Sequence, residues 1–170
     1  MSNYWNFVPL EKKHKRKEFD CGNDELNQYL RKYARQNDSK GISKAFVAVR
    51  PDAPSVIDGY YTISSSLIKF SSMPEQNRLK LPAYPIPAAL IGRLAVDSFC
   101  QGQGLGTELL VDALLRIVKA SKEIGIYAVR VDAIDEMAKQ FYLKHEFIPF
   151  KDNELSLFLP LQTIKQEFNK

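Results

Sequence analysis

The stretch Gln101-Gly102-Gln103-Gly104-Leu105-Gly106 stands between an apolar segment, residues 88–96, and a segment with helical periodicity that ends near Gly125. The apolar segment predicts a central strand, and the periodic apolar residues predict a helix. A helix start carries unpaired N–H groups and partial positive charge. Glycines let the backbone approach an anion closely. The stretch therefore predicts a pyrophosphate cradle.

A glycine-rich turn alone does not decide among cofactor-binding folds, because Rossmann and P-loop proteins use the same physics. The spacing here is not G-x-G-x-x-G, and no Gly-Lys-Ser/Thr ends the turn. A third interpretation is a glycine-rich helix start without a ligand. We favour a ligand site.

The chain before the turn alternates strand and helix signals. Residues 4–8 predict a strand, and the turn at residues 19–23 offers Asn23 as a helix cap. Leu26, Tyr29, Leu30, Tyr33 and Ala34 recur at helical spacing and predict an amphipathic helix. Residues 45–49 and 56–64 predict an antiparallel hairpin, and residues 71–87 predict a long loop.

After the turn and its helix, residues 126–131 predict a buried strand and residues 135–145 a second helix. Residues 147–150 and 155–159 predict two closing strands. The order is β-α-β-β, a long loop, then β-α-β-α-β-β. This order predicts one α/β domain over residues 1–170, with a mainly antiparallel first half and a right-handed β-α-β unit.

Composition narrows the functional classes. The chain has 170 residues and a net charge of +4. No apolar run approaches the roughly 18 residues that a membrane span needs, and the N-terminal residues lack a signal pattern. We expect a cytoplasmic protein without a membrane partner. Cys21 and Cys100 lack metal-ligand spacing, so we expect free thiols and no metal.

Two motifs resemble the GNAT acetyltransferase family. Gln101-x-x-Gly104-x-Gly106 after Arg93-Leu94-Ala95-Val96 is similar to that family's motif A. Asp135-x-x-Ala138-x-x-Phe141-Tyr142 is similar to its motif B. The resemblance covers nearly the whole chain and implies the GNAT fold, a central mixed, mostly antiparallel sheet with helices on both faces. It also implies acetyl-CoA as the acetyl donor.

Further stretches resemble one GNAT group, the toxins of type II toxin–antitoxin modules. These stretches are Phe19-Asp20-Cys21-Gly22, Leu26-Asn27-x-x-Leu30, Gly59-Tyr60-Tyr61-Thr62, Leu81-Pro82-x-Tyr84-Pro85-x-Pro87, Gly92 to Asp97, and Phe158-Leu159-Pro160. The resemblance implies acetylation of the α-amino group of aminoacyl-tRNA, which blocks translation. It also implies a ribbon-helix-helix antitoxin as partner, and a homodimer.

The resemblance assigns roles residue by residue. It implies that the backbone of Leu94, Ala95 and Val96 holds the pantetheine arm and acetyl group. It implies that Tyr142 faces the cofactor sulfur. The resemblance also implies a cofactor contact at Asp135, where aspartate replaces an asparagine common in the family, and Glu146 replaces a common glycine. The residues implied to hold the pyrophosphate are Gln101, Gly102, Gln103, Gly104, Leu105, Gly106 and Thr107.

The residues permit a mechanism for acetyl transfer. An α-amino group has a pKa near ~8, against ~10.4 for lysine, so it needs little help from a general base. We assign no carboxylate to that role. A backbone N–H of residues 94–96 is a candidate oxyanion donor. Tyr142 is the candidate acid, with packing in the core as the alternative.

Charged residues supply candidates for tRNA contact. Arg93 lies inside an apolar strand, where a charge must be paired or functional. Either it meets a tRNA phosphate or it pairs with a surface acid. Core packing is the expected role of Trp5 and of the pair Tyr60-Tyr61, with base stacking as the alternative. The other candidates for phosphate contact are Lys32, Arg35, Lys44, Arg78 and Lys80.

Two other functions stay open from the sequence. One is a GNAT enzyme that acts on a small amine or a protein N-terminus. The other is a non-catalytic acyl-CoA-binding module, which the intact glycines and Tyr142 argue against.

Overall fold

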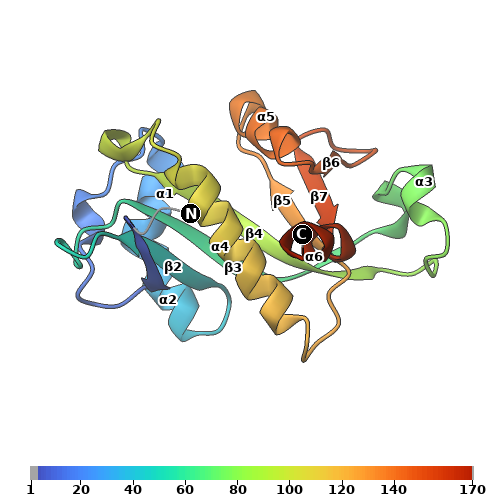
Figure 1. The fold of residues 1–170 in the computed structure, drawn as a ribbon, viewed down its shortest axis with the longest axis horizontal. Helices are drawn as coiled ribbons and strands as arrows, with labels where there is room; N and C mark the ends of the chain where they lie inside the picture. The colour runs from blue at the N-terminus through green and yellow to red at the C-terminus, as the bar shows by residue number, and fades with distance from the viewer. Residues whose placement is uncertain (1–3, 170) are drawn as a thin grey trace. The chain divides into compact units, whose positions relative to one another are not determined.

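The computed structural model describes residues 4–169. Its seven strands form one mixed sheet in the order β1-β2-β3-β4-β5-β7-β6 (Figure 1). The chain divides into two compact units. Unit 1 comprises the residues up to Ser64 together with Gly92–Ala113, and unit 2 comprises Ser65–Ile91 and the residues from Leu114 onward.

Unit 1 is built on an antiparallel arrangement. β1 (Asn6–Pro9) pairs with β2 (Lys44–Val49), and β2 pairs with β3 (Gly59–Ile68). The predicted hairpin is therefore confirmed, although β1 and β3 begin later than expected. The core of this unit includes Phe19, Leu30, Val47 and Tyr60, all nearly inaccessible to solvent.

One helical segment of unit 1 runs from α1 (Asp24–Gln28) through η2 (Tyr29–Tyr33) to α2 (Ala34–Ser39), with a short η1 (Arg16–Glu18) before it. Asn23 caps α1, because its side chain accepts a hydrogen bond from the Leu26 N–H at 3.0 Å. The middle turn η2 is a π-helix. A π-turn rotates later residues relative to an ideal helix, and Tyr33, predicted to be buried, is 51% exposed.

Unit 2 contains the parallel part of the sheet. β4 (Ile86–Val96) runs parallel to β5 (Ala128–Asp132) over Ala88–Ile91, as the predicted β-α-β unit requires. β7 (Ser156–Pro160) pairs antiparallel with both β5 and β6 (Ile148–Pro149). The core of this unit includes Ile68, Met73 and Phe158.

Three features of unit 2 differ from the sequence-based expectation. The long loop contains η3 (Phe70–Ser72) and α3 (Glu75–Arg78), and β4 starts at Ile86 rather than residue 88. Helix α6 (Leu161–Phe168) follows β7 and was not predicted. Leu161 and Ile164 are buried, so this helix is held by tertiary packing of one apolar face.

Candidate active site

The glycine turn lies between η4 (Ser98–Cys100) and α4 (Leu105–Ala120). Gly102 and Gly104 have positive φ angles of 78° and 86°, a conformation that side chains with a Cβ rarely adopt. A Cβ at either position would meet no atom within 4 Å. The glycines are therefore required by the backbone path, and the space in front of them is open.

The N-terminus of α4 presents backbone N–H groups at the glycine turn. A helix-type hydrogen bond joins the Glu108 N–H to the Gly104 carbonyl at 3.2 Å. The N–H groups of Leu105 and Gly106 precede it in the first turn of the helix, where an N–H group has no carbonyl of its own helix to bond. With the dipole of a 16-residue helix behind them, these groups suit an anion. The residues present thus fit a pyrophosphate.

The glutamine side chains of the turn are used internally. The Gln101 Nε2 donates to the Val96 carbonyl at 3.0 Å and to the Cys21 carbonyl at 3.1 Å. The Gln103 Nε2 donates to the Phe99 carbonyl at 3.3 Å. These bonds brace the turn against the end of β4. The turn therefore offers backbone groups to a ligand while its glutamines hold the shape.

The end of β4 is fixed by further contacts within unit 1. The Asp97 N–H donates to the Asp58 carbonyl at 2.8 Å, and the Asp97 carboxylate accepts from the Asp20 N–H at 3.1 Å. Gly59 faces this strand closely, because a Cβ there would lie 3.1 Å from the Ala95 carbonyl oxygen. Leu94 and Val96 are half-buried and Ala95 is buried. The strand that is predicted to hold the pantetheine arm is thus rigidly positioned.

Tyr142 lies in unit 2 on helix α5 (Glu136–Lys144). Its ring packs edge-on against Phe141, with centroids 5.2 Å apart, and tilted against Phe147 at 5.4 Å. Burial raises the pKa of the Tyr142 phenol, and the nearby charge of Asp132 raises this pKa further. The phenol therefore stays protonated at neutral pH, which is the form that a proton donor needs.

Asp135 begins the tyrosine helix. Its carboxylate oxygen Oδ1 accepts a hydrogen bond from the Ala138 N–H at 2.8 Å, so Asp135 is the N-cap of α5. A contact between Asp135 and the cofactor stays a prediction. Glu146, the other departure from the family pattern, has a positive φ of 71° in the turn after α5.

The predicted tRNA-contact residues fall into two groups. Lys32, Arg35 and Lys80 are exposed. Lys44 instead pairs with Asp38 at 3.3 Å, and Arg78 pairs with Glu75 at 3.6 Å while lying over the Phe70 ring. Their roles in tRNA binding stay predictions, but the second group has partners within the chain.

Arg93 makes a contact that the sequence did not suggest. Its guanidinium lies over the Tyr29 ring, 3.6 Å from the ring centroid, in a cation–π arrangement. A contact between Arg93 and a tRNA phosphate stays a prediction. Trp5, Tyr60 and Tyr61 are buried, as expected for core residues. Cys21 and Cys100 are free thiols. Burial raises the pKa of Cys100 to about 11, which disfavours a thiolate nucleophile there.

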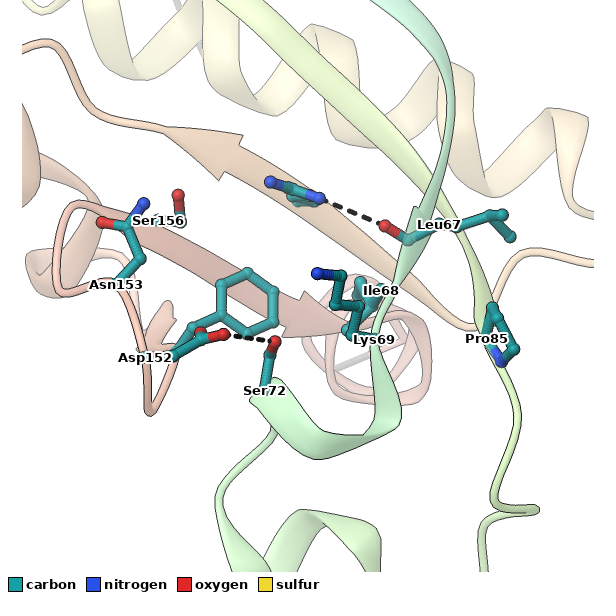
Figure 2. Close-up of a pocket in the computed structure, with 10 residues that line it drawn as sticks. Leu67, Ile68, Lys69, Ser72, Pro85, Asp152, Asn153 and Ser156 are labelled. Carbon is teal, nitrogen blue, oxygen red and sulfur yellow. Dashed lines mark hydrogen bonds between the residues drawn. The ribbon is translucent and has the colours of Figure 1, made fainter.

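A pocket of about 420 Å³ lies wholly in unit 2, and the sequence analysis missed it (Figure 2). One sequence feature could have pointed to this pocket. Arg130, like Arg93, is a charged residue inside a predicted apolar strand. The remaining lining residues come from strands and loops that are far apart in the sequence, and they could not be grouped without the fold. The lining consists of Leu67, Ile68, Lys69, Ser72, Pro85, Arg130, Phe150, Asp152, Asn153 and Ser156.

Within residues 4–169, no group of three or more His, Cys, Asp or Glu side chains is arranged to hold a metal ion. In the same range, no helix has both the length and the apolar character needed to cross a membrane.

Comparison with known proteins decides the family. Residues 68–149 match the model described as an acetyltransferase (GNAT) domain. A relative from Mycobacterium tuberculosis, named a tRNA-acetylating toxin, is 37% identical over 141 residues, which cover 83% of this chain and 82% of that protein. The chain belongs to the GNAT acetyltransferase family. The enzyme is thus an acetyltransferase with acetyl-CoA as its donor.

Two solved structures extend the likeness of this GNAT acetyltransferase to the whole fold. AtaT complexed with acetyl-methionyl-tRNAfMet is 31% identical, with a TM-score of 0.89 over 96% of this chain and 99% of that one. A tyrosine-to-phenylalanine mutant of the AtaT toxin, bound to acetyl-CoA and to the C-terminus of the antitoxin AtaR, is 30% identical. Its TM-score is 0.83 over 99% of this chain and 100% of that one. The predicted GNAT fold is confirmed.

Proposed function

We propose that this GNAT acetyltransferase moves the acetyl group of acetyl-CoA to the α-amino group of aminoacyl-tRNA and so blocks translation. The observation that carries the proposal is the likeness of nearly the whole chain to AtaT in complex with acetyl-methionyl-tRNAfMet. The relative named a tRNA-acetylating toxin supports the same acceptor. The enzyme then requires an antitoxin, and the AtaT–AtaR complex supports such a partner.

In this proposal the glycine turn binds the donor. The N–H groups at the start of α4 hold the pyrophosphate, and the backbone of Leu94–Val96 holds the pantetheine arm. The side chains of Gln101 and Gln103 support this binding indirectly, because they already donate to carbonyls of their own unit. Acetyl-CoA supplies the thioester carbonyl that is attacked.

Acetyl transfer then proceeds in three steps. The neutral α-amine attacks the thioester carbon, and a backbone N–H of residues 94–96 stabilises the oxyanion. The C–S bond breaks, and the Tyr142 phenol donates its proton to the departing sulfur. The proton lost by the amine passes to solvent, and the phenol regains a proton. A raised pKa makes phenolate unfavourable, so Tyr142 acts by donation and rapid reprotonation.

We further propose a single domain over residues 1–170, a homodimer, a ribbon-helix-helix antitoxin and a cytoplasmic location. The homodimer and the antitoxin class follow from the resemblance to the toxin group. The location follows from the acceptor, since charged tRNA is used in the cytoplasm.

Growth of a bacterium that expresses the chain without an antitoxin tests the proposal. We expect arrest with the natural chain and relief with Tyr142→Phe, while the purified variant still binds acetyl-CoA in calorimetry. Tyr127→Phe is the matched control, because it removes a partly buried hydroxyl elsewhere in unit 2 and should leave the arrest intact. Normal growth with the natural chain, at confirmed expression, would contradict a toxin.

A further inference from the structure

The pocket of unit 2 has two cations in its wall and no assigned use. Lys69 follows the end of β3 and is exposed, whereas Arg130 lies on β5 and is half-buried. Figure 2 shows the amino end of Lys69 directed toward the middle of the lining residues. Asp152 is the acidic residue of the lining, and its carboxylate accepts a hydrogen bond from Ser72 at 2.8 Å. The lining therefore carries one net positive charge.

Two nitrogens of the Arg130 guanidinium have partners within the chain, and the third has none among the described residues. One terminal nitrogen donates to the Leu67 carbonyl at 3.1 Å, and the other lies 3.4 Å from the Asp132 carboxylate. Its Nε is buried without a hydrogen-bond partner among the described residues. The Arg130 side chain as a whole is 31% exposed, so its accessible part can meet a ligand. A planar guanidinium and an ammonium that line the same pocket match the oxygens of a phosphate.

The pocket is connected to Tyr142 through Asp132. The Ser156 hydroxyl, in the pocket wall, donates to Asp132 at 2.6 Å, and Arg130 pairs with the same carboxylate. Asp132 is also the charge that acts on the Tyr142 phenol. Helix α5, which carries Tyr142, contacts β7, which carries Ser156. A group bound in the pocket is therefore close to the proposed proton donor, within one unit.

We propose that this pocket binds the terminal nucleotide of the acceptor tRNA, with Lys69 and Arg130 on its phosphate. The inference rests on the proposed function and names the part of the substrate that is recognised. A charged rim with an apolar wall of Leu67, Ile68 and Pro85 suits a phosphate joined to a sugar and base. An apolar amino acid side chain bound in the same place would bring no acceptor to Lys69 or Arg130.

Binding of a 5′-fluorescein-labelled CCA trinucleotide, measured by anisotropy at several salt concentrations, tests the pocket directly. We expect Lys69→Gln to weaken binding about tenfold. It should also reduce the slope of log K against log salt by roughly 0.7, the value for one phosphate contact on a single strand. Lys122→Gln is the matched control, an exposed lysine outside the pocket with the same charge change. Equal affinity and slope for the natural chain and Lys69→Gln would overturn the inference.

A second measurement separates nucleotide recognition from amino acid recognition. We expect Lys69→Gln to lower kcat/KM for aminoacyl-tRNA about tenfold and to leave kcat/KM for the corresponding amino acid amide unchanged. An equal loss for both acceptors would place the amino acid in the pocket and overturn the inference. Arg130→Lys keeps the charge but loses the planar fork, so we expect a smaller loss for aminoacyl-tRNA alone.

The two proposals fail in different ways. If the natural chain acetylates no aminoacyl-tRNA, the proposed function fails, and the trinucleotide experiment still decides the pocket. If aminoacyl-tRNA is acetylated and Lys69→Gln behaves as the natural chain, the function stands and the pocket inference fails. Thermal unfolding of each variant checks its fold, and we expect Lys69→Gln to melt with the natural chain because Lys69 is exposed.

Discussion

The glycine turn of unit 1 and the tyrosine helix of unit 2 are built in opposite ways. The turn is exposed and offers backbone N–H groups, while its two glutamine side chains bond to nearby carbonyls. Helix α5 offers one buried phenol that aromatic rings hold in place. A backbone site depends on the path of the chain, whereas a side-chain site depends on one atom. Substitutions should therefore affect donor binding at the turn and the rate of chemistry at the helix.

The largest effect, a loss of kcat, is expected when the hydroxyl of Tyr142 is removed. Tyr142→Phe keeps the ring and its packing and removes only the hydroxyl. We expect kcat to fall by about 10²–10⁴, the usual contribution of a positioned proton donor, with the acetyl-CoA dissociation constant unchanged. Steady-state kinetics and calorimetry give the two quantities. A weakened affinity for acetyl-CoA with unchanged kcat would contradict the difference drawn between the two regions, because Tyr142 would then act in binding and not in the chemical step.

The second-largest effect is expected on stability, where Gly59 of β3 packs against the end of β4. Gly59→Ala places a Cβ 2.8 Å from the Leu109 side chain and 3.1 Å from the Ala95 carbonyl. We expect a loss of about 1–3 kcal/mol in the free energy of unfolding, because the neighbouring backbone must shift. Urea unfolding measures it. Gly125→Ala is the control, since a Cβ there meets no atom within 4 Å. A Gly59→Ala variant as stable as the control would show that β3 does not restrain the strand.

A smaller effect is expected within the turn itself. Gly104→Ala meets no atom, but the positive φ of 86° costs a residue with a Cβ about 1–2 kcal/mol. If the turn moves to relieve this strain, acetyl-CoA binding should weaken by roughly tenfold while kcat at saturating donor stays near that of the natural chain. Calorimetry and saturation kinetics check both values. Unchanged binding would remove the glycine turn from the donor site.

The smallest effect is expected at the first residue of the tyrosine helix. Asp135→Ala removes the cap on the Ala138 N–H and should lower the free energy of unfolding by about 1 kcal/mol. Asp135→Asn keeps a capping oxygen and should be nearly as stable as the natural chain. Thermal unfolding compares them. If Asp135→Asn changes donor affinity instead, the side chain contacts the cofactor as the family resemblance implies.

The sequence predicted most of the elements that position the site. The apolar strand, the glycine turn and the motif around Tyr142 are local patterns, and each lies where the spacing indicated. The final helix was missed because its apolar positions, Leu161 and Ile164, are few and become meaningful only against the rest of unit 2. The exposure of Tyr33 was missed because a π-turn changes the phase of the helix.

Side-chain partners were predicted less well than elements. The contact of Arg93 with the ring of Tyr29, 64 residues earlier in the chain, was not predicted. The pocket of Lys69 and Arg130 was also missed, because its residues come from β3 and the segment after it, the residue before β4, β5, and β7 with the loop before it. Such groupings depend on which strands become neighbours, and no local pattern contains that information.

Mass spectrometry of the aminoacyl end of tRNA tests the central claim most directly. Purified enzyme is incubated with acetyl-CoA and a mixture of charged tRNAs, and the terminal adenosine is released by nuclease and weighed. We predict aminoacyl-adenosine heavier by one acetyl group, at the α-amino nitrogen, for one amino acid or a few, and none with Tyr142→Phe. Charged tRNA left unmodified by enzyme that still binds acetyl-CoA would contradict the assignment of aminoacyl-tRNA as the acceptor.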